Sequence, residues 1–131
     1  MTKKPLIAIV DDDQSAREGI VDLVTAMGYE PQAFERAEDF LQSLQIARSD
    51  CLITDVRMPG MTGLELLDLL LASGKTIPTI VLTAFTLEAD RMRALAAGAV
   101  CYVPKPFQEN ELSQCIRIAL SSGGRSSDDG G

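Results

Sequence analysis

Polar residues that could share one chemical task stand at the ends of short apolar runs in this chain. In chain order they are Asp11 and Asp12 after LIAIV, Asp55 after CLIT, Thr83 at the end of PTIVLT, and Lys105 two residues after VCYV. Oxygen ligands without histidine or thiolate suit a hard cation, Mg²⁺ or Mn²⁺ rather than Zn²⁺. A carboxylate can also attack phosphorus to form an aspartyl phosphate, whose charge a lysine, a hydroxyl and a metal ion would stabilise.

Three consecutive aspartates, Asp11 to Asp13, follow the first apolar run. Two unit charges about 4 Å apart repel by roughly 4 kcal/mol at an effective dielectric near 20. Such a cluster is therefore either spread into solvent or held by a cation. Which of the two applies depends on what else in the chain can reach the cluster. Asp13 would point to solvent or to the start of the next helix, where the helix dipole favours negative charge.

The elements that must position these residues alternate along the chain. Strands are predicted from short apolar, β-branched runs at 6–10, 51–55, 78–83 and 100–103, and a weaker strand, expected near the edge because Pro31 lacks a donor, at 30–34. Helices are predicted from amphipathic spacing at 15–28, 37–45, 63–73, 88–98 and 108–120. This alternation is typical of an α/β fold whose parallel sheet is covered by helices on both faces. Sites in such sheets form at the carboxyl ends of the strands, where the strand order reverses.

Local signals mark the ends of two helices. Ser15 with Glu18 predicts a capping box at the start of the first helix, and Gly28 predicts its end. Thr62 with Glu65 predicts a second capping box. The polar, Gly/Ser-rich segment at 122–131 is interpreted as a flexible tail or linker stump after a single domain over 1–121.

Composition limits the class of protein. Hydrophobic residues make up 46% of the chain, which predicts a packed core. A net charge of −7 argues against direct binding to nucleic acid, and no apolar stretch approaches the length of about 18 residues that favours a membrane span. The lack of histidine excludes Ser-His-Asp and Cys-His catalysis. Cys51, Cys101 and Cys115, which form no CxxC pair, are interpreted as reduced, buried cysteines of a cytoplasmic protein.

Four motifs together resemble the receiver domain of two-component response regulators, a CheY-like module. They are IVDDD (9–13), TDVRMPGMTG (54–63), VLTA (81–84) and YVPKPF (102–107). The resemblance covers residues 6 to about 120 and implies a flavodoxin-like, doubly wound sheet of five parallel strands in the order 2-1-3-4-5. Each motif alone is weak, and their order and spacing make the set specific.

The resemblance also implies a phosphoacceptor site. Asp55 would accept a phosphoryl group from a phosphohistidine on a sensor histidine kinase or a phosphotransfer protein. Asp12 and Asp55 would ligate Mg²⁺, and Asp11 would act mostly through a metal-bound water. The backbone carbonyl of Arg57 would be the third protein ligand.

The same family pattern implies a switch. Lys105 would pair with the phosphoryl group, and Thr83 would move to hydrogen-bond it. Tyr102 would swing inward as Thr83 moves, although an ordinary half-buried strand tyrosine is an open alternative. The Lys105–Pro106 bond is expected to be cis. Arg57 and Phe85 flank the path of an attacking water and carry neither carboxylate nor amide, so slow self-dephosphorylation is expected.

The output would be a changed surface over residues 88–103 and 108–120, which binds a different partner or a second copy of the chain. Charges at Glu88, Asp90, Arg91 and Arg93 could serve a homodimer, although a solvated face is the commoner reason for such a run. The motif around Asp55 most resembles receivers joined to LuxR-type helix-turn-helix outputs, which implies a transcription factor whose DNA-binding part is absent here.

Two other functions stay open. One is a scaffold that signals without phosphate. The other is a phosphatase with an aspartyl-phosphate intermediate, which would need a carboxylate two residues after the nucleophile, where this chain has Arg57. The expected role is therefore a switch rather than a turnover enzyme.

Overall fold

The structure is a computed structural model, and it describes residues 4–43 and 48–123. The strands are β1 (Leu6–Val10), β2 (Glu30–Phe34), β3 (Cys51–Asp55), β4 (Thr79–Thr83) and β5 (Cys101–Pro104). The helices are α1 (Gln14–Ala26), α2 (Ala37–Gln42), α3 (Gly63–Ala72), α4 (Glu88–Ala96) and α5 (Glu109–Gly123). All strand pairs are parallel, in the order β2-β1-β3-β4-β5. The predicted fold class and strand order are confirmed.

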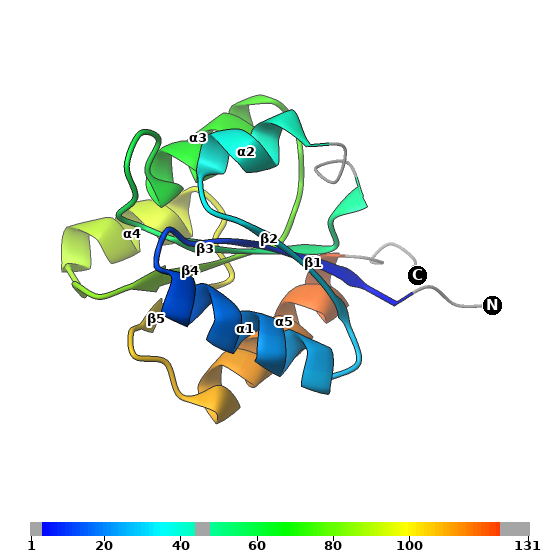
Figure 1. The fold of residues 1–131 in the computed structure, drawn as a ribbon. Helices are drawn as coiled ribbons and strands as arrows, with labels where there is room; N and C mark the ends of the chain where they lie inside the picture. Colours follow the sequence, from blue (N-terminus) through cyan, green and yellow to red (C-terminus); the bar gives the residue numbers. More distant parts are fainter. Residues whose placement is uncertain (1–3, 44–47, 124–131) are drawn as a thin grey trace.

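Helices cover both faces of the sheet, with α1 and α5 on one side and α2, α3 and α4 on the other (Figure 1). Successive residues of β1 alternate between the two sides, because side chains in a strand point to opposite faces. Ile7 and Ile9 pack toward α1 and α5, whereas Ala8 and Val10 pack toward α2 and α3. Burial on both faces explains why β1, β3 and β4 are continuous apolar runs.

The start of α1 differs from the prediction. Asp13, not Ser15, is the N-cap, and its side chain accepts a hydrogen bond from the Ser15 backbone N at 3.1 Å. Glu18 accepts instead from the Gln14 side chain at 2.9 Å. Aspartate and serine cap helices about equally well, so the choice between neighbours depends on where the chain leaves β1. The expected direction of Asp13, toward the start of this helix, is confirmed.

Other helix ends agree with the sequence more closely. The Thr62–Glu65 capping box is present at the start of α3, and Gly28 follows α1 with φ +90°. Helix α2 ends at Gln42, where Ser43 turns to an extended conformation, so the predicted end at 45 was too late. Helix α5 runs to Gly123, past the predicted end at 120. The remainder of the predicted tail, 124–131, lies outside the described residues.

The expectation of three reduced cysteines is wrong for two of them. Cys101 of β5 and Cys115 of α5 form a disulfide, whereas Cys51 is free and buried in β3. The 14-residue spacing gave no sign of this pairing, because it depends on α5 folding back beside β5. None of the helices in the described parts of the chain is long and apolar enough to cross a membrane.

Candidate functional site

The register of the sheet brings Asp11 and Asp55 together. Val10, the last residue of β1, lies opposite Thr54 of β3, so the next residue of each strand is an aspartate at the same edge. Strand β1 lies between β2 and β3, which is the point where the strand order reverses. Ligands bind at this position in open α/β sheets.

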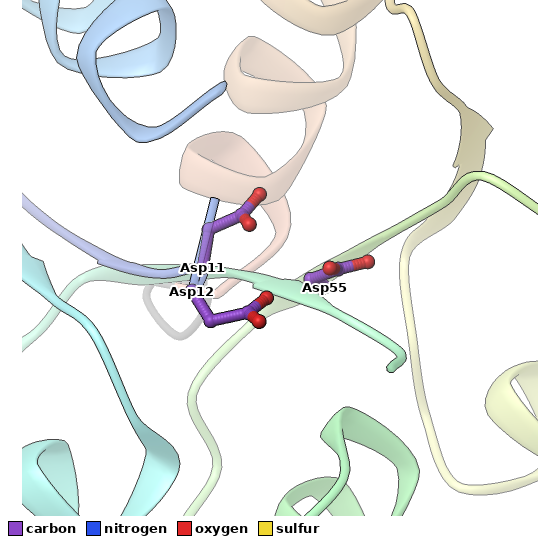
Figure 2. A group of neighbouring side chains, drawn as sticks. All are labelled: Asp11, Asp12 and Asp55. Carbon is purple, nitrogen blue, oxygen red and sulfur yellow. The ribbon is translucent and has the colours of Figure 1, made fainter. Parts of the chain in front are cut away.

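Three carboxyl groups gather at that edge. Asp11 and Asp55 are buried, Asp12 is exposed, and one carboxylate oxygen from each lies within 4.8 Å of the others. Figure 2 shows the three side chains near one another, Asp11 and Asp12 after β1 and Asp55 at the end of β3. This donor set, oxygen alone with one member open to solvent, fits a hard divalent cation such as Mg²⁺ or Mn²⁺. Asp13 takes no part, because it caps α1.

Lys105 places an ammonium group between two of these carboxylates. Its Nζ lies 3.1 Å from Asp11 Oδ2 and 3.3 Å from Asp55 Oδ2. Its backbone N donates to the Thr83 carbonyl at 2.7 Å, and the Lys105–Pro106 bond is cis, as predicted. The lysine thus reaches across from β5 to the ends of β1 and β3.

Burial and charge set the titration of this cluster. Burial, followed by the nearby Asp11 charge, raises the pKa of Asp55 above its ordinary value, and Lys105 offsets only part of that rise. For Lys105, burial works against the charged form, but Asp11 and Asp55 outweigh it and raise its pKa. Three carboxylates with one ammonium leave an excess of negative charge, which a divalent cation would relieve.

Two residues that the sequence did not single out hold this edge of the sheet in place. Arg17 Nη1 donates to the Asp11 carbonyl at 2.7 Å. Gly63 begins α3 directly against Asp55, and a Cβ at this position would overlap the Asp55 carbonyl oxygen. The only signal for Gly63 was its place in the motif TDVRMPGMTG.

Thr83 and Tyr102 converge on the loop between β4 and α4. The buried Thr83 hydroxyl donates to the Phe85 carbonyl at 2.8 Å and accepts from the Phe85 backbone N at 3.0 Å. The half-buried Tyr102 hydroxyl lies 3.5 Å from the carbonyls of Phe85 and Leu87, at the limit of hydrogen bonding. The two residues predicted to act as a switch therefore contact the same loop.

Arg57 links the loop after β3 to α4. Its guanidinium lies 5.5 Å from the centre of the Phe85 ring, and its Nη2 lies 3.7 Å from Asp90 Oδ2. Phe85 is 60% exposed and the Arg57 side chain 56%, so the ring and the guanidinium both lie at the surface. The sequence suggested Arg57 and Phe85 as neighbours of the site, but it did not suggest Asp90 as their partner.

The family model of the response regulator receiver domain matches residues 7–117, so the chain belongs to this family. Response regulator protein TodT of Pseudomonas putida is 38% identical over 115 residues, which are 88% of this chain and 51% of TodT. Transcriptional regulatory protein FixJ of Bradyrhizobium diazoefficiens is 32% identical over 120 residues, 92% of this chain and 58% of FixJ. The chain thus spans about half the length of the curated relatives it matches.

Solved structures agree with the fold. The structure of response regulator StyR has a TM-score of 0.85 at 39% identity, and the match covers 92% of this chain and 61% of StyR. The resemblance to receiver domains that the motifs indicated is confirmed.

Proposed function

We infer that this chain is a phosphorylation-controlled switch and that Asp55 is its phosphoacceptor. The observation that carries this is the position of the Asp55 carboxylate, which lies 3.3 Å from the Lys105 ammonium and within 4.8 Å of the other two aspartates at the carboxyl edge of the sheet. An Asp55 oxygen would attack the phosphorus of a phosphohistidine on a sensor histidine kinase or phosphotransfer protein. The P–N bond breaks, the imidazole leaves, and an acyl phosphate remains on Asp55.

The chain's own donors fit the expected metal. Asp12 and Asp55 would hold Mg²⁺ or Mn²⁺ with the backbone carbonyl of Arg57, and Asp11 would act through water. When bound, the ion would supply positive charge that stabilises the phosphoryl oxygens during transfer. Lys105 would supply the second positive charge, since its Nζ already lies 3.3 Å from the accepting carboxylate.

The switch would follow from competition for the Thr83 hydroxyl. This hydroxyl now donates to the Phe85 carbonyl, and a phosphoryl oxygen on Asp55 would be a stronger, charged acceptor. If the Thr83 hydroxyl turned toward the phosphoryl oxygen, it would release the loop at Phe85 to Leu87, which Tyr102 also contacts. The surface of α4, β5 and α5 would then shift between two populations.

The Arg57–Phe85 contact supports slow self-dephosphorylation. Arg57 follows Asp55 by two residues and its guanidinium lies 5.5 Å from the centre of the Phe85 ring, and neither side chain offers a carboxylate or amide to orient an attacking water. An aromatic ring would also limit the approach of water from that side. We expect the phosphoryl group to survive longer here than with a polar residue at position 85.

The output would lie outside this chain. FixJ is named a transcriptional regulatory protein, and the receiver, placed at 1–121, spans only about half of such relatives. We propose that phosphorylation controls transcription from the cytoplasm, through a DNA-binding part of LuxR type, while the acidic receiver itself does not bind DNA.

A homodimer through α4 and β5 is a further part of the proposal. The charges of α4 that suggested it are engaged within the chain. Arg91 pairs with Glu88 at 3.0 Å, and Arg93 pairs with Asp68 of α3 at 2.7 Å. A dimer would therefore have to exchange these exposed pairs, which are individually weak.

Intact-protein mass after incubation with Mg²⁺ and a small acyl phosphate tests the proposal. One added phosphoryl group is expected in the wild type, and none in Asp55→Asn or without the metal. Labelling of Asp55→Asn to the same extent would reject Asp55 as the acceptor. A folded wild type that no donor labels would favour the phosphate-independent scaffold, and continuous hydrolysis of the donor would favour a phosphatase.

A further inference from the structure

The disulfide between Cys101 and Cys115 joins an edge strand to the helix that packs on it. Cys101 begins β5, Cys115 lies in the middle of α5, and their Cα atoms are 6.2 Å apart. This separation lies within the usual range for a disulfide. No step of the proposed phosphoryl transfer uses either sulfur.

Apolar packing brings these two sulfurs together without needing the bond. Helix α5 buries Leu112, Ile116 and Ala119 in the same core cluster as Val103 of β5. A core of this size is enough to hold a helix on a sheet in a chain of this length. The two thiols would therefore remain neighbours when reduced, in a geometry ready to close again.

Of the three cysteines, Cys101 is the one that is partly open to solvent, because Cys51 and Cys115 are both buried. Cys101 is half-buried on the edge strand β5, where a small oxidant can reach it. Cys51 is completely buried in β3, and burial, with a smaller effect of Asp50, raises the pKa of its thiol to about 12. Because the thiolate is the reactive form, Cys51 is expected to stay inert.

We propose that Cys101 and Cys115 are a reversible redox pair, oxidised by hydroperoxides, which locks α5 covalently to β5. The Cys101 sulfur attacks a peroxide oxygen, the O–O bond breaks, and water or an alcohol leaves while a sulfenic acid forms. The Cys115 sulfur then attacks the Cys101 sulfur, and water leaves as the S–S bond forms. The two sulfurs together give up two electrons to the peroxide, and a dithiol reductant reverses the step by exchange.

Reversibility rests on the proposed cytoplasmic location, because disulfides there are usually transient or redox-sensing rather than permanent. The bond joins two of the elements, β5 and α5, whose surface phosphorylation is proposed to change. Tyr102 directly follows Cys101, and α5 is the last described helix of the receiver. Oxidation would thus be a second input, which restrains α5 independently of Asp55.

The test equilibrates the full chain in glutathione buffers from reducing to oxidising, then counts thiols by alkylation after acid quenching and unfolding. Wild type is expected to pass from three free thiols to one, because Cys51 remains. Cys101→Ala is expected to keep its two remaining thiols throughout, and Cys51→Ala to respond like wild type. Amides of α5 are expected to exchange hydrogen severalfold more slowly in the oxidised form. A pulse of hydrogen peroxide on the reduced chain is expected to give the same one-thiol product.

Several outcomes would overturn the proposal. Three thiols in the most oxidising buffer would show that the pair does not close, and one thiol in the most reducing buffer would show a permanent structural bond. Covalent dimers on a non-reducing gel would show that the disulfide forms between chains. Equal rates of amide hydrogen exchange for α5 in the reduced and oxidised forms would show that the bond does not restrain this helix. Asp55→Asn is expected to keep the full thiol response, so failure of the phosphoryl proposal and failure of this one can be told apart.

Discussion

Replacing Gly63 by alanine tests how closely α3 must approach the phosphoacceptor strand. A Cβ at position 63 would overlap the Asp55 carbonyl oxygen and lie 2.9 Å from the Asp55 carbonyl carbon and 3.2 Å from Thr54 Oγ1. The obstacle is mainly backbone, so no side-chain rotation can make room. The start of α3 or the end of β3 would have to move.

The magnitude follows from this overlap. Forcing an extra carbon into a well-packed site costs roughly 1–3 kcal/mol. We expect a cost of about 3 kcal/mol, because here the obstacle is backbone. Gly19 in α1 is the matched control, since a Cβ there would meet only Phe107 Cζ, at an ordinary 3.9 Å. Gly19→Ala should be neutral or stabilising by up to about 1 kcal/mol, because alanine favours the helix.

Urea unfolding of both variants, with the midpoint and slope measured together, gives the free energy of unfolding. Gly63→Ala should shift the midpoint to lower urea and should also weaken Mg²⁺ binding, since Asp55 moves with the strand. If Gly63→Ala is no less stable than Gly19→Ala, the close approach of α3 to Asp55 does not constrain the fold, and the reasoning fails.

Three further predictions concern the charged cluster and its surroundings. Without metal, Asp55→Asn should raise the free energy of unfolding by about 1 kcal/mol at neutral pH. The pKa of Asp55 is raised in the folded state, so this gain is absent below the pKa of an unfolded aspartate, about 3.9, and grows as the pH rises above it. Denaturation measured at several pH values would contradict this if the gain were the same at every pH. Lys105→Met should bind Mg²⁺ more tightly in a calorimetric titration, because the ammonium no longer competes for Asp11 and Asp55; weaker binding would refute the competition. Phe85→Glu should shorten the lifetime of the phosphoryl group severalfold, and Phe85→Leu should shorten it much less. Equal lifetimes in the two variants would show that Phe85 does not shield the phosphoryl group from water.

The sequence was sufficient for the order of the elements, because every strand except β2 (EPQAF) is a short run rich in apolar residues and the helices show amphipathic spacing. It was also sufficient to bring Asp11, Asp12, Asp55 and Lys105 together, since parallel strands place their carboxyl ends at one edge. These inferences depend on the spacing of apolar residues and on the order of the elements, and neither changes when an element boundary is wrong by one or two residues.

Features that depend on side-chain geometry were not predictable in the same way. Asp13 rather than Ser15 caps α1, because both residues are good N-caps and the conformation of the chain after β1 decides which of them begins the helix. The Cys101–Cys115 bond and the Arg57–Asp90 ion pair join residues far apart in sequence, so they require the packed positions of β5, α5 and α4. The roles of Thr83 and Tyr102 remain predictions, supported by their shared contact with the loop at Phe85.

The most direct test of the central claim is to locate the phosphoryl group itself. The wild-type chain would be incubated with Mg²⁺ and an acyl phosphate, trapped with borohydride, which reduces an aspartyl phosphate to homoserine, and sequenced by mass spectrometry. Homoserine at position 55 alone is the predicted result. Homoserine at another aspartate, with Asp55 unmodified, would contradict the assignment of Asp55 as the phosphoacceptor.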